Sequence, residues 1–92
     1  MDNNKFIGLC KDMIVDYLQA SEMYSNSEIL SMSKHNGIYV VWLCKALQNN
    51  KALLSTTMQD TRYYEITYNG DKGEVYFDSY IKEKNICKFL DN

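Results

Sequence analysis

Apolar residues recur at helical spacing near the start of the chain. The stripe consists of Phe6, Cys10, Met13 and Tyr17, with Ile7, Ile14 and Leu18 beside it. Charged and amide side chains fall largely on the opposite side, which is typical of an amphipathic helix that covers a hydrophobic surface. Asn3 or Asn4 can cap its first turn. We therefore expect one long N-terminal helix packed on a sheet.

The hydrophobic pattern weakens between residues 21 and 37. Ser25 and Glu28 have the spacing of a capping box, and a short apolar run follows them. These features predict a short helix that ends at Gly37. The lone histidine, His35, lies in the same polar linker.

The densest run of β-forming residues covers residues 38–47 and contains the only tryptophan, Trp42. Its two alternating sets of side chains are both largely apolar. A strand of this kind is usually central in a sheet or covered on both faces. We therefore expect this strand inside the sheet, with its second face against another structure such as a partner chain.

Three further strands complete the predicted sheet. Residues 48–51 predict a tight turn in which Asn adopts positive φ, and residues 52–58 a second strand. Residues 63–68 alternate cleanly, and the glycines of Asn69–Gly73 predict a hairpin turn into a strand over residues 74–82. The predicted architecture is an α+β fold of two layers. The long N-terminal helix packs on one face of a four-stranded antiparallel β-meander, with a cystatin-like order of elements.

Length and composition narrow the class of protein. With 92 residues, of which 46% are hydrophobic, we expect a single α+β domain over residues 1–92. The net charge of −2 lacks the basic character that nucleic-acid binding requires. Three cysteines without a C-x-x-C pair argue against disulfides and zinc, and favour a reducing compartment. No stretch predicts a membrane span or a signal peptide, so we expect a cytoplasmic protein.

Few residues suggest catalysis. Cys44 and His35 could act as nucleophile and base, but Cys44 alternates with apolar residues on a strand, which favours a buried structural cysteine. The Asn69–Gly73 loop lacks the acidic ligands of a calcium site and the helix start of a phosphate site. The remaining candidate carboxylates are better explained as solvated side chains; they are Asp60, Glu65, Asp71, Glu74 and Asp78. The sequence therefore predicts no catalytic residue, metal site or cofactor, and a hydrolase or nuclease is disfavoured.

Eight tyrosines are the most distinctive feature of the composition. Several fall on strand positions out of phase with Trp42, so they could gather on the sheet face turned away from the helix. Tyrosine is enriched in interfaces because it offers contact area and a hydrogen bond at low entropic cost, although it also simply favours strands. The candidate partner-binding residues on this face are Tyr39, Val41, Leu43, Lys45, Tyr63, Glu65, Tyr76, Asp78 and Tyr80.

Several segments share a pattern with known sequences; they are Phe6–Ile7, Leu9–Lys11, Val40–Asn49, Lys51–Leu53, Ser55–Thr56 and Tyr63–Lys72. In these segments the chain resembles a family of small uncharacterised proteins from phages and prophages of low-GC Gram-positive bacteria. Residues 21–37 depart from the family pattern. The resemblance implies no activity for particular residues. It implies a context, because small early phage proteins commonly bind and inhibit a host protein, often a component of antiviral defence.

Together these observations predict a non-enzymatic, phage-type protein that binds and inhibits a host protein through the face away from the helix. A homodimer formed through the same face, or through an unpaired strand edge, is expected to accompany this role. The alternative is a protein that sequesters a small molecule or nucleotide signal in an aromatic-lined pocket between helix and sheet. The cations near the strands that could meet its phosphate are Lys45, Lys51, Arg62 and Lys72.

Overall fold

The computed structural model describes residues 1–91, and its first element is the long helix α1, Asn3–Ser21. Asn92, which belongs to the predicted domain, lies outside the described residues. The helix begins after Asp2, whose side chain accepts a hydrogen bond from the backbone N–H of Lys5 at 2.8 Å. The predicted caps, Asn3 and Asn4, lie inside the first turn instead. The buried stripe of α1 repeats every fourth residue and consists of Phe6, Cys10, Ile14 and Leu18.

A second, shorter helix, α2, spans Asn26–Lys34. Ser25 and Glu28 form the predicted capping box, in which each side chain accepts a hydrogen bond from the other residue's backbone N–H at 3.1 Å. Two side chains of α2, Ile29 and Met32, are buried against the same core as α1. The short helix predicted between residues 21 and 37 is therefore present.

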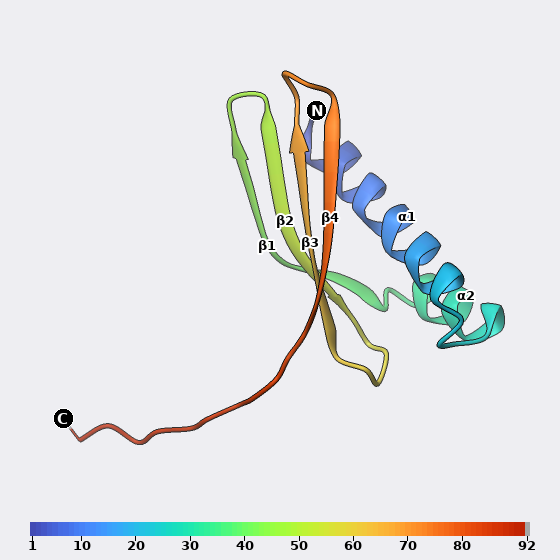
Figure 1. Ribbon diagram of the computed structural model, residues 1–92, viewed down its shortest axis with the longest axis vertical. Coiled ribbons are helices and arrows are strands. Elements are labelled where there is room, and N and C mark those ends of the chain that lie inside the picture. Colours follow the sequence, from blue (N-terminus) through green and yellow to red (C-terminus); the bar gives the residue numbers. More distant parts are fainter. Residues whose placement is uncertain (92) are drawn as a thin grey trace.

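Four antiparallel strands form one sheet in the order β1-β2-β3-β4, with both helices on the same side of it (Figure 1). Their bounds are Ile38–Ala46 for β1, Asn49–Thr56 for β2, Arg62–Asn69 for β3 and Glu74–Ile81 for β4. Each strand pairs with the next along the chain, which is the arrangement of a meander. The predicted α+β fold, a helix on one face of a four-stranded antiparallel meander, is confirmed.

The first hairpin turn is shorter than predicted. Leu47 and Gln48 form it, and β2 already begins at Asn49, so the turn predicted at residues 48–51 is displaced. Leu47, at φ 56°, adopts the left-handed conformation that we expected of an asparagine. The Asn69–Gly73 turn follows the prediction, with Gly73 at φ 65°.

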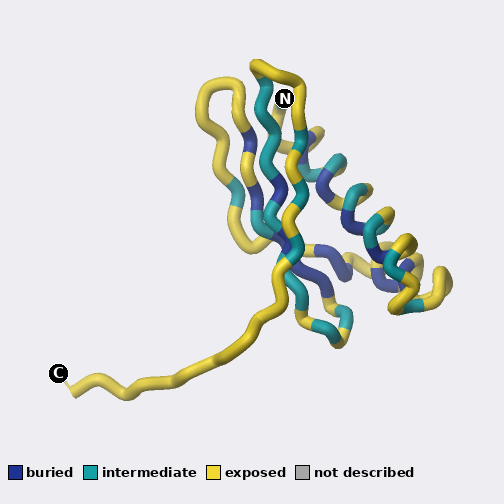
Figure 2. The backbone as a smooth tube through the Cα atoms, in the orientation of Figure 1, coloured by how far each residue is buried: buried dark blue, intermediate teal, exposed yellow. Residues whose placement is uncertain are grey.

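β1 lies at an edge of the sheet, so the prediction of a central strand is wrong. Along β1 only Ile38 is buried and only Leu43 is half-buried, and Figure 2 shows the rest of the strand exposed. In a four-stranded meander the first strand has a neighbour on one side alone. The helices pack mainly over the later strands. Both faces of β1 are apolar, but neither face of this strand is fully covered.

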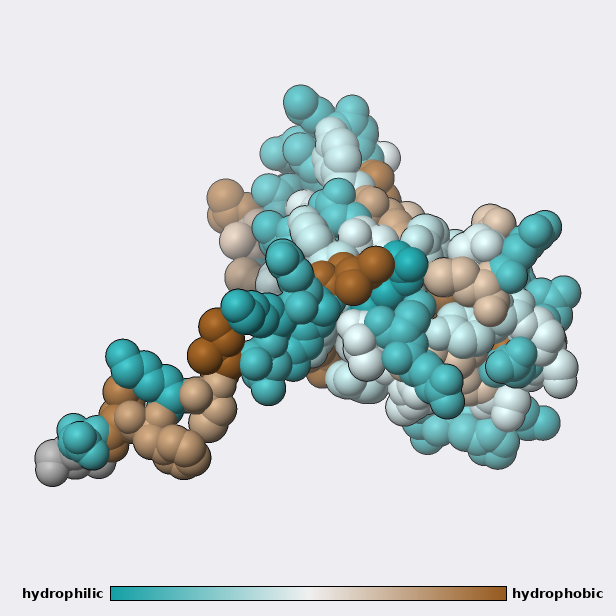
Figure 3. All heavy atoms as spheres, turned by 60° about the horizontal axis from the view of Figure 1, so that its bottom comes forward, coloured by the Kyte–Doolittle hydropathy of each residue, from teal (hydrophilic) through white to brown (hydrophobic). Residues whose placement is uncertain are grey.

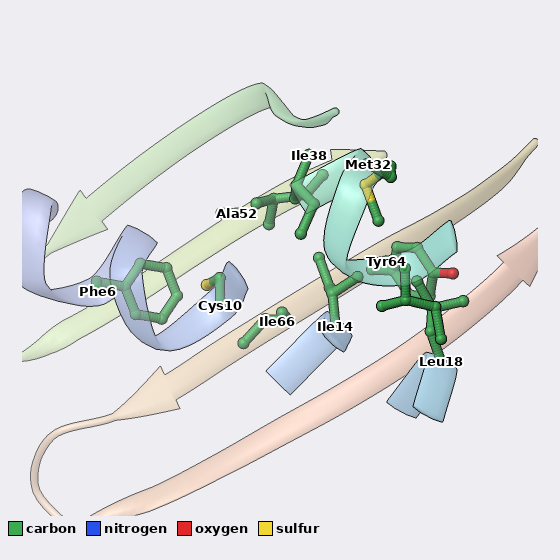
Figure 4. Packing of buried hydrophobic residues seen from close by; sticks show 11 residues of the cluster. Phe6, Cys10, Ile14, Leu18, Met32, Ile38, Ala52, Tyr64 and Ile66 are labelled. Carbon is green, nitrogen blue, oxygen red and sulfur yellow. The ribbon is translucent and has the colours of Figure 1, made fainter. Parts of the chain in front are cut away.

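The core lies between the helices and the sheet (Figure 4). Its sheet-borne members come from β1, β2 and β3 and are Ile38, Ala52, Leu54, Tyr64 and Ile66. An aromatic cluster extends the core to β4, because the ring centroid of Tyr17 lies 5.8 Å from that of Tyr64 and 5.3 Å from that of Phe77. These contacts hold α1 against a single face of the sheet.

Residues 82–91 form neither helix nor strand and are exposed throughout. Figure 1 shows this tail leaving the end of β4 and running away from the body of the protein. The radius of gyration of 15.1 Å exceeds the value of about 12 Å expected for a compact chain of this length. The tail is therefore an extended feature that does not pack on its own domain.

Candidate protein-binding surface

The strand register divides the sheet into two faces. Leu54 pairs with Tyr64, and Tyr64 with Ser79, so these side chains share the inner face, which the helices cover. Side chains alternate along a strand, so their neighbours form the outer face. Among residues 1–91 no helix lies on this outer face (Figure 1). On β2, β3 and β4 it includes Lys51, Leu53, Tyr63, Glu65, Glu74, Tyr76, Asp78 and Tyr80.

A β-bulge in β1 decides which of its residues reach the outer face. Val40 pairs with Leu54, but Trp42 pairs with Leu53, so Val41 has no partner in the register. An extra residue in one strand reverses the alternation of side chains beyond it. Trp42 therefore lies beside Leu53 on the outer face, although strict alternation places it on the inner one.

The same bulge moves two of the nine predicted binding residues to the other face of the sheet. Leu43 pairs with Ala52, and Lys45 pairs with Asn50; both partners are buried beneath the helices. Leu43 and Lys45 therefore belong to the inner side of β1, and their predicted place on the outer face is wrong. Cys44 lies on the outer face in their stead.

The other predicted binding residues stay together. Those that share the outer face are Tyr39, Tyr63, Glu65, Tyr76, Asp78 and Tyr80. Val41 occupies the bulge and is 46% exposed. Their role in binding stays a prediction, but their common location on one uncovered face is a property of the fold.

Apolar and aromatic side chains occupy adjacent rows across the outer face. One row places Tyr39, Tyr63 and Tyr80 on successive strands around Ser55 of β2. The next row begins with Trp42, which is 40% exposed although it neighbours Leu53. Tyr39 and Tyr80 are exposed and Tyr63 is half-buried. Exposed aromatic side chains that gather on one face mark contact sites more often than scattered single rings do.

Sequence reasoning missed Trp42 and Leu53 as members of this surface. The assignment of Trp42 failed because a one-residue bulge inverts a pattern whose period is two residues. The available signal was that both alternating sets of β1 are apolar, which leaves the face of Trp42 undecided.

The β3–β4 half of the outer face is acidic. Glu65 lies directly opposite Asp78, a position at which like charges destabilise a strand pair. Lys51 offsets part of this charge, with its Nζ 3.5 Å from Glu65 Oε1. Within residues 1–91, Asp78 is in no ion pair. The surface therefore combines aromatic contact area with negative charge that its own strands do not neutralise.

Tyr76 and Glu74 form a polar contact at one end of this acidic half. The hydroxyl of Tyr76 donates a hydrogen bond to the carboxylate of Glu74, and this bond raises the pKa of Tyr76. The ring of Tyr76 is nevertheless 54% exposed, so its apolar surface stays open to a partner.

The three cysteines have different environments. Cys44 is exposed on the outer face, so the prediction of a buried structural cysteine is wrong at this position. The buried cysteine is Cys10, and burial raises the pKa of its thiol to about 12. His35, a candidate base that the sequence disfavours, is exposed at the end of α2. Residues 1–91 contain no group of three His, Cys, Asp or Glu side chains placed to hold a metal ion.

The cations considered for a nucleotide site are dispersed and partly engaged. Arg62 forms an ion pair with Asp60, with 3.0 Å between Nε and Oδ2, and it also donates to the hydroxyl of Tyr17. Lys51 is paired with Glu65 across the outer face. No pocket is found in the part of the chain that the structure describes. The described residues therefore offer no pocket in which these cations could hold a nucleotide.

Comparison with known proteins identifies a family whose function is unknown. No curated protein and no solved structure matches the chain. Within the described residues, no helix is both long enough and apolar enough to cross a membrane. A family model described as a family of unknown function (DUF6275) matches residues 7–89, which include α2, all four strands and most of the tail. The chain therefore belongs to the DUF6275 family.

Proposed function

We propose that the chain is a non-enzymatic binding protein that contacts another protein through its outer sheet face. The observation that supports this function is the row that begins with Trp42 and Leu53, which adjoins the tyrosine row and is covered by no helix of residues 1–91. Tryptophan and tyrosine dominate binding energies in protein interfaces because each buries a large area with few rotatable bonds. The acidic half around Asp78 adds orientation and partner selectivity.

The edge of β1 extends this surface. An exposed edge strand presents unpaired backbone N–H and C=O groups, and partners exploit such edges by adding a strand. From Ile38 to Cys44, β1 carries no charged side chain that would oppose this pairing. The proposed surface therefore offers side-chain contacts on the face and backbone hydrogen bonds at the rim.

The proposed partner is a host protein. The resemblance to small phage and prophage proteins of low-GC Gram-positive bacteria favours a phage-type protein that acts in the host cytoplasm and inhibits its target, for example a component of antiviral defence. An inhibitor of this kind needs no catalytic group, because occupying a functional surface of the target is sufficient. The nucleotide-sequestering alternative has no specific geometric feature in its favour.

An affinity experiment with matched variants tests this function. The tagged chain, the double variant Trp42→Ser/Tyr76→Ser and the control Leu47→Asn are each used to capture proteins from a host lysate. Leu47 is 93% exposed in the β1–β2 turn, so the control removes an exposed apolar side chain outside the face. We expect one stoichiometric host protein with the parent and the control, and at least a tenfold loss with the double variant. Equal capture by all three proteins would show that another surface binds the partner.

A further inference from the structure

The tail, residues 82–91, is the second uncovered apolar feature of the chain. Its large apolar side chains lie within five residues and are almost fully solvated, at 74% exposure for Ile86, 92% for Phe89 and 75% for Leu90. Figure 3 shows hydrophobic atoms beside hydrophilic ones on the tail, a segment that stands clear of the body. Hydrophobic residues clustered in this way normally mark a contact site.

The tail and the outer face are complementary in charge. The tail contains three lysines against two carboxylates, a balance of +1. The strands of the outer face contribute three carboxylates, Glu65, Glu74 and Asp78, against Lys51, a balance of −2. Opposite charges that flank apolar contacts both attract and orient two surfaces.

We propose that two copies of this chain exchange tails, so that residues 82–91 of each copy dock on the outer sheet face of the other. In this arrangement Ile86 and Phe89 cover the apolar row at Trp42, and the tail lysines face the carboxylates around Asp78. The exchange is reciprocal, as two-fold symmetry requires. Each chain then buries both the tail side chains and the apolar row of its outer face.

The direction of the chain favours a second copy over the tail's own face. β4 ends at Ile81, opposite Arg62, and the tail continues beyond the end of the sheet (Figure 1). To lie on its own face, the tail must reverse direction, yet residues 81–84 are Ile-Lys-Glu-Lys and contain neither glycine nor proline. A second copy receives the tail without any reversal.

The length of the tail fits the proposed site. Ten extended residues span at most about 33 to 36 Å. Four strands at the usual spacing of about 4.8 Å make a sheet roughly 15 Å wide. A tail is therefore long enough to cross the whole outer face of a partner copy. The family match runs to residue 89, so residues 82–89 of the tail lie within the region that the family model covers.

This inference rests on the same outer face as the proposed function. It adds that the docked tail regulates access to that face. A docked tail covers the surface that another protein would contact, so partner binding has to displace it. The exchange is measured on the purified chain alone. If the purified chain shows no tail exchange, the proposed partner binding still stands. If no partner is captured from the lysate, the proposed tail exchange still stands.

Sedimentation equilibrium of the full chain tests the association, from about 1 μM to 1 mM. The tail variant Ile86→Ser/Phe89→Ser alters side chains that are exposed and do not support the fold. We expect a dimer for the parent and for Leu47→Asn, and at least tenfold weaker association for the tail variant and for Trp42→Ser. A parent that is monomeric throughout, or a tail variant that dimerises like the parent, would overturn the proposal.

Two native cysteines identify which chain receives the tail. Cys44 lies on the outer face and Cys87 lies in the tail, whereas Cys10 is buried. A short bismaleimide is added to a mixture of the Cys44→Ser and Cys87→Ser chains. Tail exchange predicts a covalent dimer that forms in the mixture and in neither variant alone. A linked monomer of the parent, with no linked dimer in the mixture, would mean that the tail folds onto its own face.

Discussion

The two faces of the sheet carry similar side chains, but the helices bury the inner face and leave the outer face uncovered. On the inner face, Tyr64 and Phe77 pack with Tyr17 of α1 at centroid distances of 5.3 to 5.8 Å. On the outer face, Tyr63 and Tyr80 form a cross-strand pair that α1 does not cover. Aromatic character therefore does not decide burial in this fold. The decisive feature is the register, which directs alternate residues of one strand toward or away from the helices.

The contrast is sharpest between neighbours. Leu53 and Leu54 are adjacent on β2, and Tyr63 and Tyr64 are adjacent on β3, yet the second member of each pair is fully buried and the first is not. Because the residue type is the same within a pair, substitutions at the two positions isolate the effect of the face. The cysteines offer a third comparison, since Cys10 is buried and Cys44 is exposed.

Thiol reactivity should show the largest difference between the core beneath the inner face, where Cys10 is buried, and the exposed positions of Cys44 and Cys87. We expect a thiol reagent such as dithionitrobenzoate to modify Cys44 and Cys87 rapidly in the native protein, and Cys10 only on unfolding. Folded domains have unfolding equilibrium constants that correspond to roughly 10³-fold or greater protection. Two thiols should therefore react in a fast phase and the third at least about a thousandfold more slowly.

The Cys44→Ser chain serves as the control for this assignment. It should lose one fast equivalent and retain the slow one. Three fast equivalents in the parent would mean that α1 separates readily from the inner face.

Truncation of the two leucines should differ next most strongly. Leu54→Ala removes a fully buried side chain, and such substitutions cost about 2–5 kcal/mol of unfolding free energy. Leu53→Ala removes a half-buried side chain from the uncovered face, and we expect a loss of about 1 kcal/mol or less. Urea unfolding followed by circular dichroism measures both. Equal losses would show that the outer face is covered in solution.

Alkaline pH should destabilise the fold through groups that are buried between the helices and the sheet. Burial raises the pKa of the Cys10 thiol from near 9 to about 12, so between these pH values the unfolded chain loses a proton that the folded chain keeps. The unfolding free energy therefore decreases as pH rises through this window. Burial also raises the pKa of Tyr64, which steepens the decrease above its ordinary value of 10. Urea unfolding between pH 8 and 11 measures this slope, and the Cys10→Ala chain should show a shallower one.

The parts of the fold that follow local rules could be predicted from the sequence. The capping box of Ser25 and Glu28 uses residues three positions apart, and the clean alternation of residues 63–68 reports one covered face. The Asn69–Gly73 turn then determines which strand pairs next. These signals are sufficient for the meander and for the outer-face positions on β3 and β4.

The errors concentrate in β1, where no local rule applies. Its two apolar sets match a central strand as well as an uncovered edge strand, because composition does not report which neighbours are present. The bulge at Val41 is a single extra residue relative to β2, so it depends on pairing between strands. The resulting errors at Leu43, Lys45 and Cys44 are three consequences of one displaced register.

The smallest expected effect concerns the two tyrosine hydroxyls. The hydroxyl of Tyr64 is buried and has no hydrogen-bond partner among the described residues, so Tyr64→Phe removes an unsatisfied polar group while keeping the ring packed against Tyr17. Replacing such a group by an apolar one is neutral or stabilising, and we expect a gain of up to about 1 kcal/mol. Tyr63→Phe on the outer face should change the unfolding free energy by less than about 0.5 kcal/mol. A loss of more than about 1 kcal/mol at Tyr64 would mean that its hydroxyl is hydrogen-bonded in solution, and that the inner face supplies a polar partner to this group.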